Sequence, residues 1–131
     1  MSTLSTHALD TASGRPAAGL RLVLEQQPQP ETWQAFATEY FGQAVTEPGW
    51  ILLARGVTNA DGRCPDLLPA GTQLTPGIYR VSFDTAGYFA ARDLRGFYPL
   101  AQITFEILAT DEHYHVPLLL SPFGFSTYRG S

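Results

Sequence analysis

The feature that most constrains this chain is a series of short segments in which apolar and polar residues alternate. Such alternation gives a β-strand one apolar face, as at Leu20, Leu22 and Leu24. Further strand-like segments lie at 50–57, 79–83, 103–107, 113–120 and 125–129. Turn residues separate them, and the turn at 59–62 needs a positive φ at Gly62. The pattern predicts a mostly β protein, an antiparallel β-sandwich.

Two segments have a helical period instead. Apolar residues recur every three or four positions at Trp33, Phe36, Ala37, Tyr40, Phe41 and Ala44. This spacing predicts an amphipathic helix near residues 31–45, which 47–49 (Glu-Pro-Gly) would end. A second, short helix is expected from about Thr85 to Leu94, with Asp84 or Thr85 as its N-cap. The aromatic face of the first helix is most simply a packing surface.

Length and composition narrow the class of protein. With 131 residues, 44% of them hydrophobic and 15% charged, the chain is expected to form one domain over 1–131. Its net charge of −4, without a basic cluster, argues against nucleic acid or an anionic membrane as partner. No apolar run approaches the roughly 18 residues of a membrane span, and 1–14 lack the features of a signal peptide. We therefore expect a cytoplasmic location. Cys64 is the only cysteine, and it is best explained as a small packed residue.

Three histidines are the main candidates for chemistry. His113 and His115 stand two apart in a predicted strand, so their side chains share a face. Histidine is the side chain best placed to take and return a proton near neutral pH. For any single histidine, a plain exposed or hydrogen-bonded role is the simpler interpretation. A catalytic zinc site formed by this pair and His7 also remains open, because three nitrogens can hold the metal.

Two arginines are candidates for binding. Arg63 directly follows the turn at 59–62, and a guanidinium suits planar, oxygen-rich ligands. A surface salt bridge is the alternative for Arg63, and the same choice applies to Arg129. The closing residues Tyr128-Arg129-Gly130-Ser131 place an aromatic ring, a cation and a hydroxyl directly after strand-like sequence. That combination indicates a segment held in place at a site.

Four segments, taken together, resemble the transthyretin-related family and, within it, the hydroxyisourate hydrolases. They are 4–11 (LSTHALDT), 58–63 (TNADGR), 113–122 (HYHVPLLLSP) and 128–131 (YRGS). They follow the order found in the family and span nearly the whole chain. The last of them separates the hydrolases from the thyroid-hormone carriers.

The resemblance implies a prealbumin-like (transthyretin-type) β-sandwich that assembles as a homotetramer, a dimer of dimers, with active sites at the interface between the dimers. The implied reaction is hydrolysis of 5-hydroxyisourate to 2-oxo-4-hydroxy-4-carboxy-5-ureidoimidazoline in urate (purine) degradation. It needs no metal and no cofactor, because general acid and base groups activate the water. The implied catalytic set is His7, Arg63, His115 and Ser131, and the implied substrate-binding set is His113, Tyr128 and Arg129.

Within this set, His7 and His115 are expected to handle protons while Arg63 holds substrate oxygens. Ser131 would orient a histidine or the water through its hydroxyl or terminal carboxylate. His113 is expected to matter for binding or structure more than for proton transfer, and Arg129 to anchor the tail or bind substrate.

Two alternatives accompany the enzyme hypothesis. One is a transthyretin-like carrier of small hydrophobic aromatic ligands, and the other is a structural interaction module. The stretch from about 28 to 49, with its predicted helix, departs from the family pattern because relatives join these strands more briefly. Its effect on the tetramer is not readable from the sequence.

Overall fold

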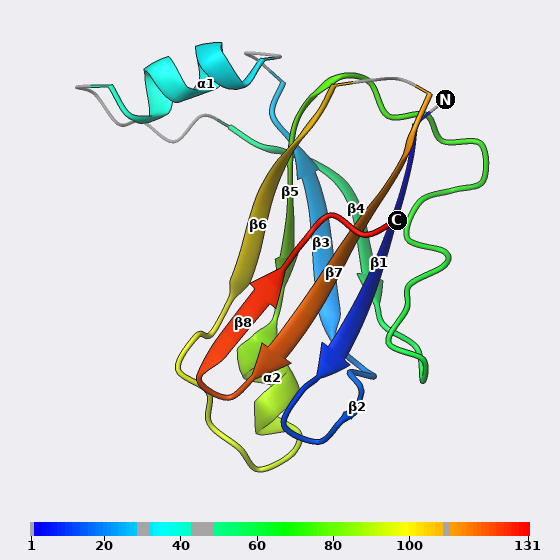
Figure 1. Ribbon diagram of the computed structural model, residues 1–131, viewed down its shortest axis with the longest axis vertical. Helices are drawn as coiled ribbons and strands as arrows, with labels where there is room; N and C mark the ends of the chain where they lie inside the picture. Colours follow the sequence, from blue (N-terminus) through cyan, green and yellow to red (C-terminus); the bar gives the residue numbers. More distant parts are fainter. Residues whose placement is uncertain (1, 29–31, 43–48, 109–110) are drawn as a thin grey trace.

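The computed structural model describes residues 2–28, 32–42, 49–108 and 111–131. Within these ranges it contains two four-stranded sheets, in the orders β2-β1-β7-β8 and β4-β3-β5-β6 (Figure 1). The strands are β1 (Thr3–Asp10), β2 (Arg15–Pro16), β3 (Arg21–Gln26), β4 (Ile51–Val57), β5 (Gly77–Phe83), β6 (Ala101–Ile107), β7 (His113–Ser121) and β8 (Gly124–Thr127). The predicted β-sandwich is therefore confirmed.

One strand pair departs from the antiparallel arrangement expected from the sequence. Strands β1 and β7 are parallel, with Thr3 opposite His113, Ser5 opposite His115 and His7 opposite Pro117. Antiparallel pairing is favoured where a short turn joins two strands, but β1 and β7 are separated by most of the chain. The parallel register sets the odd-numbered residues of both strands side by side on one face of the sheet.

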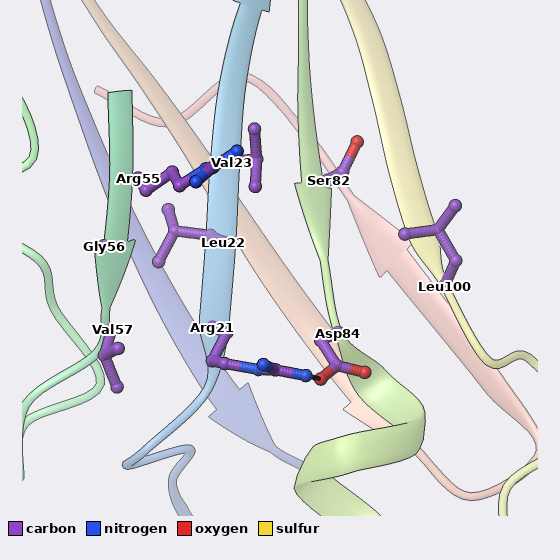
Figure 2. Close-up of a pocket in the computed structure, with 9 residues that line it drawn as sticks. All are labelled: Arg21, Leu22, Val23, Arg55, Gly56, Val57, Ser82, Asp84 and Leu100. Atoms are coloured by element: carbon purple, nitrogen blue, oxygen red, sulfur yellow. Dashed lines mark hydrogen bonds and ion pairs between the residues drawn. The ribbon is translucent and has the colours of Figure 1, made fainter. Parts of the chain in front are cut away.

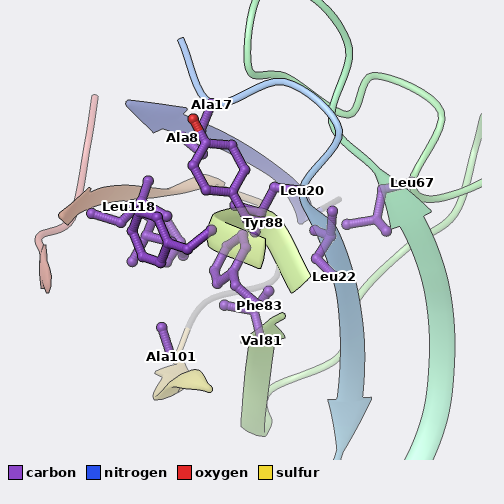
Figure 3. Close-up of a cluster of buried hydrophobic side chains, with 13 residues drawn as sticks. Ala8, Ala17, Leu20, Leu22, Leu67, Val81, Phe83, Tyr88, Ala101 and Leu118 are labelled. Atoms are coloured by element: carbon purple, nitrogen blue, oxygen red, sulfur yellow. The ribbon is translucent and has the colours of Figure 1, made fainter. Parts of the chain in front are cut away.

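The hydrophobic core lies between the two sheets. Alternation along β1 and β7 turns Ala8, Val116 and Leu118 inward, where they are buried. They meet residues of the second sheet and of helix α2 (Thr85–Ala90) in one cluster, which includes Leu22, Val81, Phe83, Tyr88 and Phe89 (Figure 3). Burial of this apolar surface is the main force that holds the sheets together.

The two helices lie at opposite ends of the sandwich (Figure 1). The predicted first helix is present as α1 (Trp33–Tyr40), whereas Ala44 and the expected stop at 47–48 fall outside the described residues. The side chain of Thr32 caps α1 by accepting a hydrogen bond from the backbone N–H of Ala35. The second helix is capped by Asp84, one of the two predicted caps, but it ends at Ala90, short of the predicted Leu94. Neither helix is long and apolar enough to cross a membrane, and no other helix occurs in the described ranges.

Helix α1 packs on the outer face of the β4-β3-β5-β6 sheet. Its buried Phe36 stacks against Tyr40 and meets Trp50 edge-on at a ring distance of 6.0 Å. The guanidinium of Arg80 lies 4.2 Å from the centre of the Trp50 ring and joins the same cluster. Helix α1 is thus attached to the sheet that does not carry the histidines.

Candidate active site

The outer face of the β2-β1-β7-β8 sheet carries the histidines. Along β1 and β7 the residues that alternate with the buried ones point outward, among them Ser5, His7, His113 and His115. The rings of His113 and His115 lie 6.5 Å apart and within 19° of parallel. This arrangement confirms the prediction that the two histidines share a face.

A serine hydroxyl joins the two histidines. The Oγ of Ser5 lies 2.7 Å from Nδ1 of His115 and 2.8 Å from Nε2 of His113. The other ring nitrogen of His113, Nδ1, lies 2.6 Å from the hydroxyl of Thr3. These contacts follow from the parallel register, which sets each hydroxyl directly opposite a ring.

The turn at 59–62 positions Arg63 beside β1. Gly62 has a φ of +74°, as the sequence required, and its carbonyl accepts a 2.8 Å hydrogen bond from the N–H of Ala8. Arg63 then forms a bridge with His7 at the edge of β1. The Nε2 of His7 lies 3.0 Å from the carbonyl oxygen of Asp61, which can only accept, so this nitrogen carries the proton. Nδ1 of His7 is therefore the nitrogen left to accept a proton.

The tail closes the other side of the histidine pair. The backbone N–H of Gly130 donates a 2.9 Å hydrogen bond to the carbonyl oxygen of His115. This bridge brings Ser131 to the same pocket as the histidines. The pocket measures about 410 Å³ and is lined mainly by polar groups, from Ser5, Arg63, His113, His115, Tyr128, Gly130 and Ser131. His7 stands beside this lining rather than in it.

Arg129 points away from the histidine pocket. Its Nη2 lies 3.2 Å from the Glu112 carboxylate, and its guanidinium lies 4.6 Å from the centre of the Tyr114 ring. Arg129 lines a neighbouring pocket of about 280 Å³, to which His115 and Tyr128 also contribute. These contacts attach the tail to the sheet.

The environment of His115 favours its neutral form. Burial lowers the pKa of His115 below its ordinary value of 6.5, and the nearby charges of Arg63, His113 and His7 lower the pKa further. The ring is therefore neutral at physiological pH and can accept a proton. Its Nδ1 is hydrogen-bonded to Ser5, so when Nδ1 carries the ring proton, Nε2 is the nitrogen that can accept one.

The three-histidine zinc site that the spacing left open is not formed. In the parts of the chain that the structure describes, no group of three or more His, Cys, Asp or Glu side chains is arranged to hold a metal ion. Cys64 packs against the hydrophobic core, and burial raises the pKa of its thiol. The arrangement on the sheet is suited to acid–base chemistry beside the cation of Arg63, which lines the same pocket.

A second hollow lies on the other sheet and has a different character. It measures about 580 Å³ and is lined by residues of β3, β4 and β5 together with Asp84 and Leu100 (Figure 2). The side chain of Arg21 runs across it to Asp84, and its Nε lies 2.9 Å from the carboxylate. Arg55 also lines it, but no histidine does. The groups suited to proton transfer are therefore on the histidine sheet.

Sequence reasoning missed three residues of the site: Thr3, Ser5 and Gly130. The period of two in β1 puts Thr3 and Ser5 on the face of His7, which was a usable signal. Thr3 and Ser5 meet His113 and His115 only because of the register between β1 and β7, two strands far apart in the sequence. No sequence pattern predicted that register. The close packing of Gly130 on the His115 ring likewise needed the structure.

The fold and the site define a class: a transthyretin-like β-sandwich with a polar, histidine- and arginine-lined pocket on one outer sheet face. The model of the HIUase/Transthyretin family matches residues 4–130. The chain is 43% identical over 131 residues to 5-hydroxyisourate hydrolase from Mus musculus, covering 99% of this chain and 96% of that protein. The chain belongs to the HIUase/Transthyretin family.

Solved structures agree with this assignment. The 5-hydroxyisourate hydrolase of Klebsiella pneumoniae is similar with a TM-score of 0.74 at 35% identity, covering 98% of this chain and 99% of that one. Sea bream transthyretin, solved in complex with thyroxine, is similar with a TM-score of 0.76 at 30% identity, covering 97% and 93%. The fold is thus shared by a hydrolase and a protein that binds thyroxine, and the side chains of the pocket must distinguish the two functions.

Proposed function

We propose that this protein hydrolyses 5-hydroxyisourate to 2-oxo-4-hydroxy-4-carboxy-5-ureidoimidazoline in urate degradation, without a metal or cofactor. The observation that carries the proposal is the pocket that joins Arg63, His115 and Ser131, three members of the expected catalytic set. The substrate is a small, planar heterocycle rich in oxygen, and its ring opens when water attacks a carbonyl. Such a reaction needs a base for the water and a positive group for the developing oxyanion.

In the mechanism, Arg63 binds substrate oxygens through its fork of donors and stabilises negative charge on the attacked carbonyl oxygen. His115 takes a proton from the water through Nε2, the nitrogen that Ser5 leaves open. His7, whose Nε2–H is held by the Asp61 carbonyl, assists proton transfer through Nδ1. Ser131 orients a histidine or the water from the tail.

The remaining members of the set line the site from the tail side. Tyr128 lines both the histidine pocket and its neighbour, where its ring can cover one face of a planar substrate. Arg129, held by Glu112 and Tyr114, fixes the tail so that Ser131 stays in place.

We further propose the homotetramer, a dimer of dimers, as the active form. Strands β6 and β8 each form one edge of their sheets, where a second copy could extend the ladder. The histidine pocket opens on the outer face of a sheet, where another dimer could cover it. Helix α1 packs on the other sheet and leaves this face uncovered. The cytoplasmic location remains a prediction.

The test is the decay of freshly generated 5-hydroxyisourate, followed by its ultraviolet absorbance with and without protein, in the presence of a metal chelator. Strong acceleration supports the metal-free hydrolase. Acceleration that disappears only with chelator contradicts the metal-free mechanism. Folded protein that gives no acceleration, but binds thyroxine in a displacement assay, is a carrier instead. The oligomeric state is measured in the same preparation by sedimentation.

A further inference from the structure

A continuous chain of hydrogen bonds runs from the inside of the pocket to the exposed end of the sheet. It passes from His115 through Ser5 and His113 to Thr3, over distances of 2.7, 2.8 and 2.6 Å. At the inner end of this series His115 is partly buried, whereas His113, nearer the outer end, is exposed. Every link joins a hydroxyl of β1 to an imidazole nitrogen of β7, so the parallel register builds the whole chain.

When all four groups are uncharged, the hydrogen bonds between them can run in only two directions. The hydroxyl of Ser5 has a single proton, so it donates to one histidine and accepts from the other. If Ser5 donates to His113, then Nδ1 of His115 carries a proton and its Nε2 is bare, ready to act as a base. If Ser5 donates to His115, then the proton of His115 sits on Nε2. Reversing the chain therefore switches His115 between its two roles.

We propose that Ser5 and His113 form a proton relay that sets the tautomer of His115 and carries away the proton that it takes from water. The inference rests on the proposed hydrolysis and deepens it, because it assigns roles to two residues that hold no substrate. Ser5 and His113 are positioning residues that act through His115. For His113, this replaces the substrate-binding role expected from the sequence.

The relay moves one proton outward during the attack of water and returns it when the ring opens. An O–H bond of water breaks, its oxygen bonds to the substrate carbonyl carbon, and its proton goes to Nε2 of His115. The proton on Nδ1 of His115 passes to Ser5, while the proton of Ser5 passes to Nε2 of His113. His113 becomes the cation and its Nδ1–H donates to Thr3. The proton returns along the same chain to the ring nitrogen of the substrate as its bond to the carbonyl carbon breaks.

Electrostatics favours moving the positive charge outward. A cation on His115 would be partly desolvated and close to other positive groups, whereas on His113 it meets solvent. The charged and titratable groups around His115 are Arg63, His113 and His7, with Ser131 in the same pocket and Glu106, Tyr114, Tyr128 and Arg129 in the adjoining one. In this arrangement the relay removes the charge from beside Arg63, which remains free to stabilise the oxyanion.

The contacts of His113 favour a relay over substrate binding. Both of its ring nitrogens are already engaged, one with Thr3 and one with Ser5. A side chain that served only to bind substrate would need a nitrogen directed to the pocket. His113 instead has the two contacts that a proton acceptor at the end of a relay requires.

The kinetic test compares Ser5→Ala with Ser5→Thr, which keeps the hydroxyl. The control is Ser126→Ala, because Ser126 is an exposed residue of β8 that takes no part in the hydrogen-bonded relay. We expect Ser5→Ala to lower kcat about tenfold or more, with KM changed less than about twofold, and Ser5→Thr to restore most of the loss. His113→Gln keeps a hydrogen-bonding group but cannot take a proton, so kcat falls here too. A raised KM with unchanged kcat in His113→Gln overturns the relay in favour of substrate binding.

A second measurement does not depend on turnover. Nitrogen NMR of the labelled histidines reads the tautomer of His115 directly. We expect the Nδ1–H form in the unliganded protein and its loss in Ser5→Ala, with Ser126→Ala unchanged. An Nε2–H form in the unliganded protein overturns the inference. An inactive wild-type protein would defeat the proposed hydrolysis, whereas an active one whose Ser5→Ala variant matches it in kcat would defeat only the relay.

Discussion

The backbone of Gly130 lies directly against the imidazole of His115. Its N–H donates to the His115 carbonyl at 2.9 Å, and a Cβ built on Gly130 would overlap Cδ2 of the ring. The same Cβ would stand 3.2 Å from Cγ of Pro117. The tail and the proposed base are therefore packed together without room for a side chain.

The first prediction concerns this contact. Gly130→Ala should shift the His115 ring or the tail, and a displaced base costs catalysis steeply because the geometry of proton transfer is strict. We expect about a 10-fold to 100-fold loss of kcat/KM, with the melting temperature little changed, because the tail lies outside the core. The control is Gly49→Ala, where a Cβ meets nothing within 4 Å and φ lies outside the positive range. Full activity in Gly130→Ala would contradict the contact.

The second prediction concerns the two proton-handling histidines. A positioned base contributes roughly 10²–10⁴-fold, so His7→Ala and His115→Ala should each lose activity on about that scale. Circular dichroism should show that both variants remain folded, because neither side chain belongs to the core clusters. Near-full activity in either variant would remove that histidine from the mechanism.

The third prediction is a pH dependence. Burial and the nearby positive charges lower the pKa of His115, and only the neutral ring can accept a proton. Activity should therefore fall as the pH drops through this lowered pKa, with the midpoint below the ordinary 6.5. A plot of kcat/KM against pH measures it. A midpoint above 6.5 would show that His115 is not the base.

The charge of Arg63 provides a control for this pH dependence. Arg63→Gln removes one of the positive charges that lower the pKa of His115, so NMR titration of His115 should show a midpoint shifted upward. Arg95→Gln, an exposed arginine in the loop after α2, should leave that midpoint where it is.

The fourth prediction concerns the turn that presents Arg63. Gly62 has a φ of +74°, and a Cβ there would overlap the carbonyl oxygen of Ala8. Gly62→Ala should destabilise the fold by about 1 kcal/mol or more, because the backbone is strained and the turn must move. Gly19 also has a positive φ, +75°, but a Cβ there would meet no other atom. Gly19→Ala therefore shows the cost of backbone strain alone, without the overlap that a side chain at position 62 would make. Thermal unfolding and kcat/KM should both fall further in Gly62→Ala than in Gly19→Ala.

The fifth prediction concerns a buried hydrogen bond in the core. The hydroxyl of Tyr88 donates to the Asp10 carboxylate at 2.8 Å, and burial and this carboxylate raise the pKa of Tyr88 to about 12. Tyr88→Phe should lower the free energy of unfolding by about 1–3 kcal/mol, because the buried carboxylate loses a donor. Urea titration measures the loss, and Tyr98→Phe, whose exposed ring keeps its aromatic neighbours, should cost much less.

The raised pKa of Tyr88 also makes the stabilisation by this hydrogen bond depend on pH. The protonated phenol is favoured in the folded state, so the stabilisation is present below about pH 10, where an unfolded tyrosine titrates. It should be lost as the pH rises from there to about 12. The Tyr88→Phe variant should not show this loss.

Much of the fold was predictable because its signals are local. The leucines at 20, 22 and 24 marked β3, the spacing of Trp33 and Phe36 marked α1, and the turn residues required a positive φ at Gly62. Similarly, the spacing of His113 and His115 was enough to place both rings on one face. Each of these features depends on residues within one element, where backbone geometry alone relates sequence position to direction.

The sequence by itself indicated six of the eight strands and both helices, but not β1 or β2, and it indicated which side chains could do chemistry. The tertiary structure decided that β1 lies parallel to β7, so that Ser5 meets His115 across 110 residues of chain. It also decided that Gly130 closes on the ring and that Arg129 turns toward Tyr114. The physical reason is that the periodicity of a strand fixes its faces but not its partner or its register, which are set by packing between distant parts of the chain.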